Sequence, residues 1–239
     1  MTKEEEYNKY LKVQRDINKQ LPELYGVSRK NICYDGIYDP KEYFEREKNR
    51  VLVILKEAQC TKGVWSPVDT PDNQYCIKQG NKPANTLIKH LASYLSGGVF
   101  DDHIRGIGYI NISKKAHFEM RSYDSELKTN FNIAKEILYK QINAINPNFI
   151  LFGNTFGFFW NSLFDNYKGY FYRVKFNVDV LDDFTEKDLS FWKKRKDDEL
   201  TLIQVYHPSS SKTHPYKYLT YGMEKCNNEE FELITYSSN

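Results

Sequence analysis

A run of five consecutive apolar residues, Val51 to Leu55, constrains the fold of this 239-residue chain more than any other feature. The run is mostly β-branched and directly follows a charged segment, which is typical of a strand buried on both faces. Lys56-Glu57-Ala58-Gln59 comes next, and a loop with glycine and proline then extends from Cys60 to Pro83. Because ligands in open α/β sheets bind beyond the carboxyl ends of the strands, the polar residues after this strand are the first candidates for a functional site.

Three further apolar runs predict three more buried strands, and each of them also ends in polar residues. The runs span residues 107–112, 148–153 and 200–206. The first of these is followed by Ser113-Lys114-Lys115, the second by Asn154-Thr155 and the third by His207-Pro208-Ser209-Ser210-Ser211. Helical periodicity predicts helices over residues 83–96 and 123–145.

The predicted strands alternate with helices, which is the pattern of a parallel α/β sheet. We therefore expect a single domain over residues 1–239, with a three-layer αβα fold and a central, mainly parallel four-stranded sheet. A helix over residues 3–20, with Tyr7, Leu11, Gln14 and Ile17 at helical spacing, is expected to pack on this domain. The other expected segments are a loop over 21–40, a hairpin or edge strand over 170–181, a charged surface stretch over 186–199 and a helix over 215–226.

The composition favours a soluble globular protein without a metal or cofactor. A hydrophobic share of 40% and a charged share of 28% are ordinary for such proteins. The four cysteines lie far apart without a CxxC pair, which argues against a zinc or iron–sulfur site and predicts reduced thiols in the cytoplasm. No 18-residue apolar stretch and no apolar N-terminal run is present, so we expect neither a membrane span nor a signal peptide. The protein is also expected to be a monomer.

In their order along the chain, the four strand ends resemble the motifs of the uracil-DNA glycosylase superfamily. Lys56-Glu57-Ala58-Gln59 is similar to a Gly-Glu-Ala-Pro-Gly motif after the first strand, and Asn111 to Lys114 is similar to a Thr-Asn-x-x-Lys strand end. Pro147 to Gly153 is similar to a Pro-x-x-Ile-x-x-x-Gly strand that follows a long helix. His207-Pro208-Ser209 keeps the final His-Pro-Ser motif intact. The resemblance covers about residues 50–225.

The resemblance implies that the protein hydrolyses the N-glycosidic bond of a base flipped out of DNA. Glu57, or Gln59 beside it, would stabilise the cationic sugar and orient a water molecule, as carboxylates do in glycoside hydrolysis. Asn111 would read the base edge by donating and accepting hydrogen bonds at once. His207 would donate a hydrogen bond to the base oxygen on which negative charge develops.

The same resemblance implies contacts with DNA and with the flipped base. Pro208, Ser209, Ser210 and Ser211 would lie on the DNA backbone, and we expect Lys114 and Lys115 at a neighbouring strand end to bind phosphates as well. An aromatic face has to stack on the base. Trp65 is preferred for this role because it follows the first motif, and Tyr75 and Phe118 are alternatives. With a net charge of only +2, the DNA has to be held by a local basic patch.

The chain departs from the best-known branch of that superfamily, whose first motif is Gly-Gln-Asp-Pro-Tyr. The Tyr that excludes the thymine methyl group has no counterpart after Gln59, and the loop from Cys60 to Pro83 is long. These differences predict a wider pocket that accepts uracil or a 5-substituted pyrimidine, such as the modified bases of some phage genomes, and defence against such phages is one possible role. Two other classes remain open: a catalytically silent nucleic-acid-binding relative, and a nucleotide-handling α/β enzyme.

Overall fold

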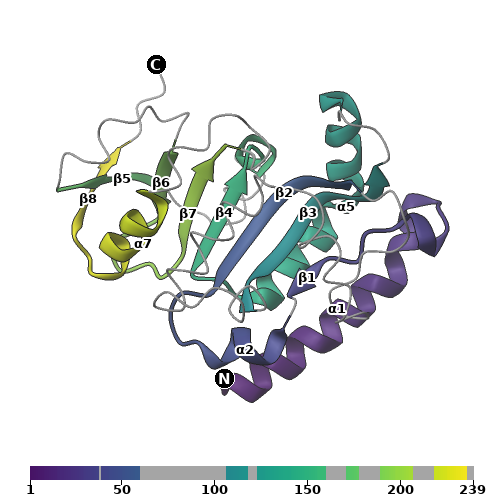
Figure 1. Ribbon diagram of the computed structural model, residues 1–239, viewed down its shortest axis with the longest axis horizontal. Coiled ribbons are helices and arrows are strands. Elements are labelled where there is room, and N and C mark those ends of the chain that lie inside the picture. Colours follow the sequence, from purple (N-terminus) through teal and green to yellow (C-terminus); the bar gives the residue numbers. More distant parts are fainter. Residues whose placement is uncertain are drawn as a thin grey trace. The chain divides into compact units, whose positions relative to one another are not determined.

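The computed structural model describes residues 1–37, 39–59, 106–117, 123–159, 171–177, 189–206 and 218–235 (Figure 1). These residues divide into two compact units. The first contains the described residues of Met1–Gly80 and Arg105–Pro147, and the second contains those of Asn81–Ile104 and Asn148–Asn239. Both units combine helices with strands, so the chain is a mixed α/β protein.

The first unit is built around the neighbouring strands β2 and β3. Its elements are α1 (Lys3–Tyr25), a 3-10 helix η1 (Arg29–Asn31), β1 (Gly36–Ile37), α2 (Pro40–Glu45), β2 (Val51–Gln59), β3 (Gly108–His117) and α5 (Asp124–Ile145). Strand β3 lies between the other two, parallel to β2 and antiparallel to β1. Helix α5 packs against β3, and α1 packs against both α5 and α2.

Helix α1 confirms the predicted N-terminal helix and extends it by five residues. Thr2 caps its start through a capping box with Glu5, and Gly26 ends it in the left-handed conformation at φ 60°. The helix continues through Pro22, so the loop predicted from residue 21 begins later than expected. Of the residues predicted at helical spacing, Gln14 and Ile17 are buried, whereas Tyr7 and Leu11 are only half-buried. The fully buried positions are Tyr10, Gln14, Ile17 and Leu21.

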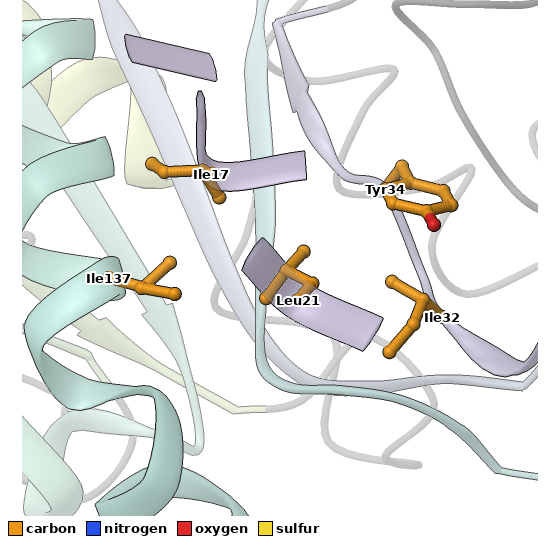
Figure 2. Close-up of a cluster of buried hydrophobic side chains, with 5 residues drawn as sticks. All are labelled: Ile17, Leu21, Ile32, Tyr34 and Ile137. Atoms are coloured by element: carbon orange, nitrogen blue, oxygen red, sulfur yellow. The ribbon is translucent and has the colours of Figure 1, made fainter. Parts of the chain in front are cut away.

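A cluster of buried apolar side chains fixes the segment that leads into β1 (Figure 2). Ile17 and Leu21 come from α1, Ile137 comes from α5, and Ile32 and Tyr34 come from the segment itself. All five side chains are at most 7% exposed. Removing apolar surface of this kind from water is the main stabilising contribution of such a cluster. The cluster therefore determines where Asp35, the residue directly after Tyr34, is placed.

An ion pair joins the start of α1 to the start of β2. The Arg50 guanidinium donates to Glu6 Oε2 at 2.7 Å, and Asn146 Nδ2 donates to Glu6 Oε1 at 2.9 Å. Burial opposes ionisation of Glu6, but the hydrogen bond and charge of Arg50, together with the Asn146 amide, give Glu6 a lowered pKa. The guanidinium also lies 5.2 Å from the ring centre of Phe44.

Replacing Glu6 with Gln should lower the free energy of unfolding at pH 7 by about 1.5–3 kcal/mol, the usual size of a hydrogen bond to a charged group. A carboxyl group with a lowered pKa stabilises the fold above its unfolded pKa and loses that contribution as the pH falls below 4.5. The difference between wild type and Glu6→Gln should therefore shrink in acid. Urea unfolding at pH 7, 4 and 3 measures this, with the exposed Glu4→Gln as the control. An unchanged difference at pH 3 would contradict the assignment.

The second unit contains a parallel strand pair that continues into antiparallel strands. Its elements are β4 (Phe149–Gly153), β5 (Tyr172–Phe176), β6 (Leu189–Lys193), β7 (Thr201–Val205), α7 (Leu219–Asn227) and β8 (Phe231–Thr235). The strand order is β4-β7-β6-β5-β8. Strands β4 and β7 are parallel, and the later pairs are antiparallel.

The four predicted core strands are all present as β2, β3, β4 and β7, and the predicted helix over 123–145 is confirmed as α5. The predicted number of strands was wrong, because the described residues contain eight. The segment predicted as an edge or hairpin contains β5, which lies between β6 and β8. The charged stretch 186–199 contains the fully buried strand β6. The predicted helix over 83–96 lies outside the described residues.

Candidate functional site

The first two polar strand tails lie beside each other on neighbouring parallel strands. Leu55 pairs with Asn111, and Glu57 pairs with Ser113. Side chains alternate along a strand, so Glu57 and Asn111 belong to the same face of the β2–β3 pair. Both strands continue through these tails, which corrects the prediction that the tails follow the strand ends.

The pairing of β2 with β3 is irregular directly after Glu57. The partners of Glu57 and Gln59 are Ser113 and His117, so two steps along β2 correspond to four steps along β3. The extra residues of β3 interrupt the regular pairing in the manner of a β-bulge, a feature that often lies beside functional sites because it redirects side chains. Lys114 and Lys115 lie in this bulge, and they point into different surroundings: Lys114 is fully buried and Lys115 is exposed.

Glu57, the candidate catalytic carboxylate, is half-buried and its Oε2 atom has no accessible surface. The Ser113 hydroxyl on the paired strand accepts a hydrogen bond from Asn130 Nδ2 at 3.0 Å and donates to the Lys115 carbonyl at 3.3 Å. Asn130 belongs to α5, so this helix fixes the polar group that faces the Glu57 position across the two strands. A carboxylate held on a paired strand is better preorganised than one on a loop.

The carboxylate of Asp35 accepts hydrogen bonds from four donors at the centre of the first unit. Its Oδ2 atom accepts from the Asn111 backbone N–H at 2.6 Å and from Asn111 Nδ2 at 3.2 Å. Its Oδ1 atom accepts from Lys114 Nζ at 2.5 Å and from Gln141 Nε2 at 3.3 Å. Asp35 is 1% exposed and Lys114 is 0% exposed, so this is a fully buried ion pair. Such a pair is tolerated only when its other polar atoms are satisfied.

Two buried glutamines complete the surroundings of this ion pair. Gln141 Oε1 accepts from Lys114 Nζ at 2.8 Å, and Gln141 Nε2 donates to Gln14 Oε1 at 2.9 Å. Gln14 Nε2 in turn donates to the Asp35 carbonyl at 3.0 Å. Gln14 comes from α1 and Gln141 from α5, so the network connects both helices to β3.

Two tyrosine hydroxyls supply further hydrogen bonds next to β1 and to the bulge. The Tyr10 hydroxyl accepts from the Ile37 N–H at 2.7 Å, and the Tyr25 hydroxyl accepts from the Lys114 N–H at 3.2 Å. Burial raises the pKa of both tyrosines, and the nearby Asp35 charge raises it further. Both hydroxyls therefore stay protonated and act as structural groups at any physiological pH.

These contacts change the predicted roles of Lys114 and Asn111. An ammonium group without exposed surface cannot reach a phosphate in this geometry, so the burial of Lys114 argues against its predicted DNA contact, and of the two lysines Lys115 remains for that role. The Asn111 amino group donates to Asp35 and to Cys33 Sγ at 3.7 Å. Asn111 was expected to donate and accept at the base edge, but its donors are already used inside the protein.

The strands that precede the third and fourth tails, β4 and β7, pair with each other up to their last residues within the second unit. Gly153 at the end of β4 pairs with Val205 at the end of β7, and the Asn154 N–H donates to the Val205 carbonyl at 2.9 Å. Asn154 has a φ of 56°, a left-handed conformation that asparagine adopts more readily than most residues. Thr155 is fully buried. Tyr206 follows β7 and is the last described residue before His207.

Several predicted site residues lie outside the described parts of the chain. They are Trp65 with its alternatives Tyr75 and Phe118, the side chain of Gln59, and the segment His207, Pro208, Ser209, Ser210 and Ser211.

Conversely, the sequence analysis did not assign Asp35, Gln14 or Gln141 to the site. Asp35 lies in a segment that was expected to be a loop, and the apolar residues Ile32, Tyr34 and Ile37 around it were its only signal.

Neither metal binding nor a known relative identifies the site further. Within the described ranges, no three His, Cys, Asp or Glu side chains gather as a metal site would require, and no helix is long and apolar enough to cross a membrane. The two described cysteines, Cys33 and Cys226, are buried thiols, and burial raises the pKa of Cys226 to about 12. No protein-family model and no curated protein sequence matches the chain.

Proposed function

We propose that this protein is a monofunctional DNA glycosylase that hydrolyses the N-glycosidic bond of a flipped uracil or 5-substituted pyrimidine. The observation that carries the proposal is the placement of Glu57 and Asn111 on one face of two parallel neighbouring strands. This is the arrangement in which a carboxylate can act at the sugar while an amide contacts the base of the same nucleotide. Defence against phages with modified bases is the role that suits such a substrate.

The proposed reaction divides the work between groups that act at the sugar, groups that contact the base and a donor to the leaving base. Glu57, with Gln59 two residues further along β2, stabilises positive charge on the sugar and orients the attacking water. Asn111 reads the base and Trp65 stacks on it. His207 donates a hydrogen bond to the base oxygen that becomes negative as the bond breaks. The protein is proposed to act as a cytoplasmic monomer with a single three-layer αβα domain, and without a metal or cofactor.

The Asn111 amino group and the Lys114 ammonium are both hydrogen-bonded inside the protein. This favours a second candidate function, that of a catalytically silent nucleic-acid-binding relative. An abasic-site assay separates the two. Duplexes that carry uracil, 5-hydroxymethyluracil or 5-hydroxymethylcytosine are incubated with an excess of protein, and abasic sites are counted with an aldehyde-reactive probe. Abasic sites in the wild-type reaction that are lost with Glu57→Gln support the glycosylase. DNA binding without any abasic site would favour the silent relative, and no binding at all would favour a nucleotide-handling enzyme.

DNA affinity should fall linearly with salt on a log–log scale, with a slope of about −0.9 for each phosphate contacted. Lys115 is the exposed member of the basic pair on β3. Lys115→Ala should therefore reduce the slope by about one and weaken binding to all sequences equally. Fluorescence anisotropy between 50 and 300 mM salt measures both, and Lys135→Ala on the exposed face of α5 is the matched control. An identical slope for both variants would remove Lys115 from the interface.

A further inference from the structure

The buried ion pair of Asp35 and Lys114 bears on base specificity, because it holds a side chain that is proposed to contact the base. Asp35 and Lys114 form a network with Asn111, the residue proposed to read the base. A base can bind only the group of the Asn111 amide, the amino group or the carbonyl oxygen, that is not already hydrogen-bonded inside the protein. That group determines which hydrogen-bonding pattern a base must have.

Three contacts determine the orientation of the Asn111 side chain. The Asp35 Oδ2 atom accepts from the Asn111 backbone N–H, and an ionised carboxylate can only accept hydrogen bonds. The adjacent Asn111 amide must therefore direct its amino group, not its carbonyl oxygen, at the same Oδ2 atom, where the separation is 3.2 Å. The Cys33 sulfur takes up the remaining N–H at 3.7 Å.

Lys114 keeps this orientation in place. Its ammonium lies 2.5 Å from Asp35 Oδ1 and contacts no solvent, so the negative charge of Asp35 is balanced inside the protein. Gln141 and the Lys114 ammonium occupy the other carboxylate oxygen, which leaves Oδ2 for Asn111. The Asn111 carbonyl oxygen has no donor among the residues that the structure describes, although the residue is only 3% exposed.

We propose that Asp35 is a positioning residue that fixes the Asn111 amide as an acceptor only, so that the site selects a base with an N–H donor at the position that Asn111 contacts. This inference rests on the proposed glycosylase function and specifies its substrate class. Uracil and its 5-substituted forms meet the requirement through N3–H, and cytosines meet it through the 4-amino group. A base whose Watson–Crick edge carries only acceptors is rejected, because one of its acceptor atoms would then face the Asn111 carbonyl oxygen without a hydrogen between them.

The test compares release of uracil and of O4-methyluracil, in which N3 carries no hydrogen, from otherwise identical duplexes. Wild type should release uracil at least about 100-fold faster, a modest value for a site that depends on one buried hydrogen bond. Two variants with the same net charge then separate positioning from a structural role. D35N/K114M keeps an oxygen that can face the Asn111 donors, and D35L/K114M keeps none.

Positioning predicts that D35N/K114M retains the discrimination and that D35L/K114M reduces it below tenfold, because the freed amide can turn and donate to N3. The ratio of the two rates cancels the folded fraction of each variant, and comparing this ratio between variants cancels the difference in leaving group. Equal discrimination in both variants would overturn the proposal. If D35L/K114M does not fold, equal rates of wild type on the two bases would overturn it as well.

A second measurement needs no catalysis and separates this proposal from the function on which it rests. In asparagine-¹⁵N-labelled wild-type protein, the Asn111 side-chain N–H signals, assigned from their loss in Asn111→Leu, should exchange slowly with solvent. Rapid exchange would show that the amide is not fixed and would overturn the proposal. Slow exchange together with the absence of base release from any DNA would confirm the fixed amide and would overturn the glycosylase function and the base selection built on it.

Discussion

Replacing Lys114 with Met is expected to lower the free energy of unfolding by about 3–5 kcal/mol, the usual cost of removing one partner of a buried ion pair. The substitution removes the only cation within hydrogen-bonding distance of Asp35 among the described residues and leaves a negative charge with 1% exposure. Asp35→Asn should be similarly costly, since it leaves the Lys114 ammonium unbalanced. Guanidinium unfolding of each variant measures the loss.

The double variant Asp35→Asn/Lys114→Met should be clearly more stable than the sum of the single changes predicts. Replacing both charges of a buried pair by groups of similar volume is often close to neutral, whereas breaking the pair is not. Lys115→Met is the matched control, because the neighbouring lysine is exposed, and it should change stability by less than about 0.5 kcal/mol. Strictly additive single effects would show that Asp35 and Lys114 do not act as a pair.

Replacing His207 with Ala should slow base release about 100- to 1,000-fold, as expected for the loss of one donor to a developing oxyanion. His207 begins the one motif that the chain keeps intact, two residues after Val205, the last residue of β7. Folding and DNA affinity should stay almost unchanged, because the residue is proposed to act on the transition state and not on binding. Single-turnover rates with excess protein measure the chemical step separately from product release.

His214→Ala is the control for this prediction, since it removes a histidine that belongs to no motif. Its single-turnover rate should match that of wild type. A full rate for His207→Ala would remove His207 from the mechanism. A loss of DNA affinity of the same size as the loss of rate would assign it to binding.

The sequence located the parts of the fold that depend on continuous apolar runs. Strands β2, β4 and β7 are buried along most or all of their length, and such runs are visible without knowledge of their neighbours. Strand β6 was not predicted, because its buried residues are followed by charged residues in the Lys-Lys-Arg-Lys run that begins at Lys193. Lys193, the last residue of this strand, is itself buried, and its ammonium donates to the Asp198 carbonyl and lies 5.1 Å from the Phe231 ring centre.

The candidate site was predictable only in part, for a similar reason. Glu57 and Asn111 could be chosen as candidates because each lies at or near the end of an apolar run, and the structure shows that their strands are parallel neighbours. Their partners could not be found, since Asp35 is 76 residues from Asn111 and 79 from Lys114 along the chain. A buried ion pair between such distant residues leaves no periodic signal. Lys114 therefore resembled a surface lysine at a strand end until its counterion was known.

The most direct test of the proposed function measures the free base released under single-turnover conditions. Matched duplexes carry uracil, 5-hydroxymethyluracil or glycosylated 5-hydroxymethylcytosine, and mass spectrometry quantifies the free base and the abasic strand together. We expect equimolar base and abasic product, with a rate on a 5-substituted pyrimidine at least comparable to that on uracil, because no tyrosine follows Gln59 to exclude a 5-substituent. Rapid release of uracil without action on any 5-substituted base would contradict the wide pocket. No free base from any of the duplexes would contradict the glycosylase function itself.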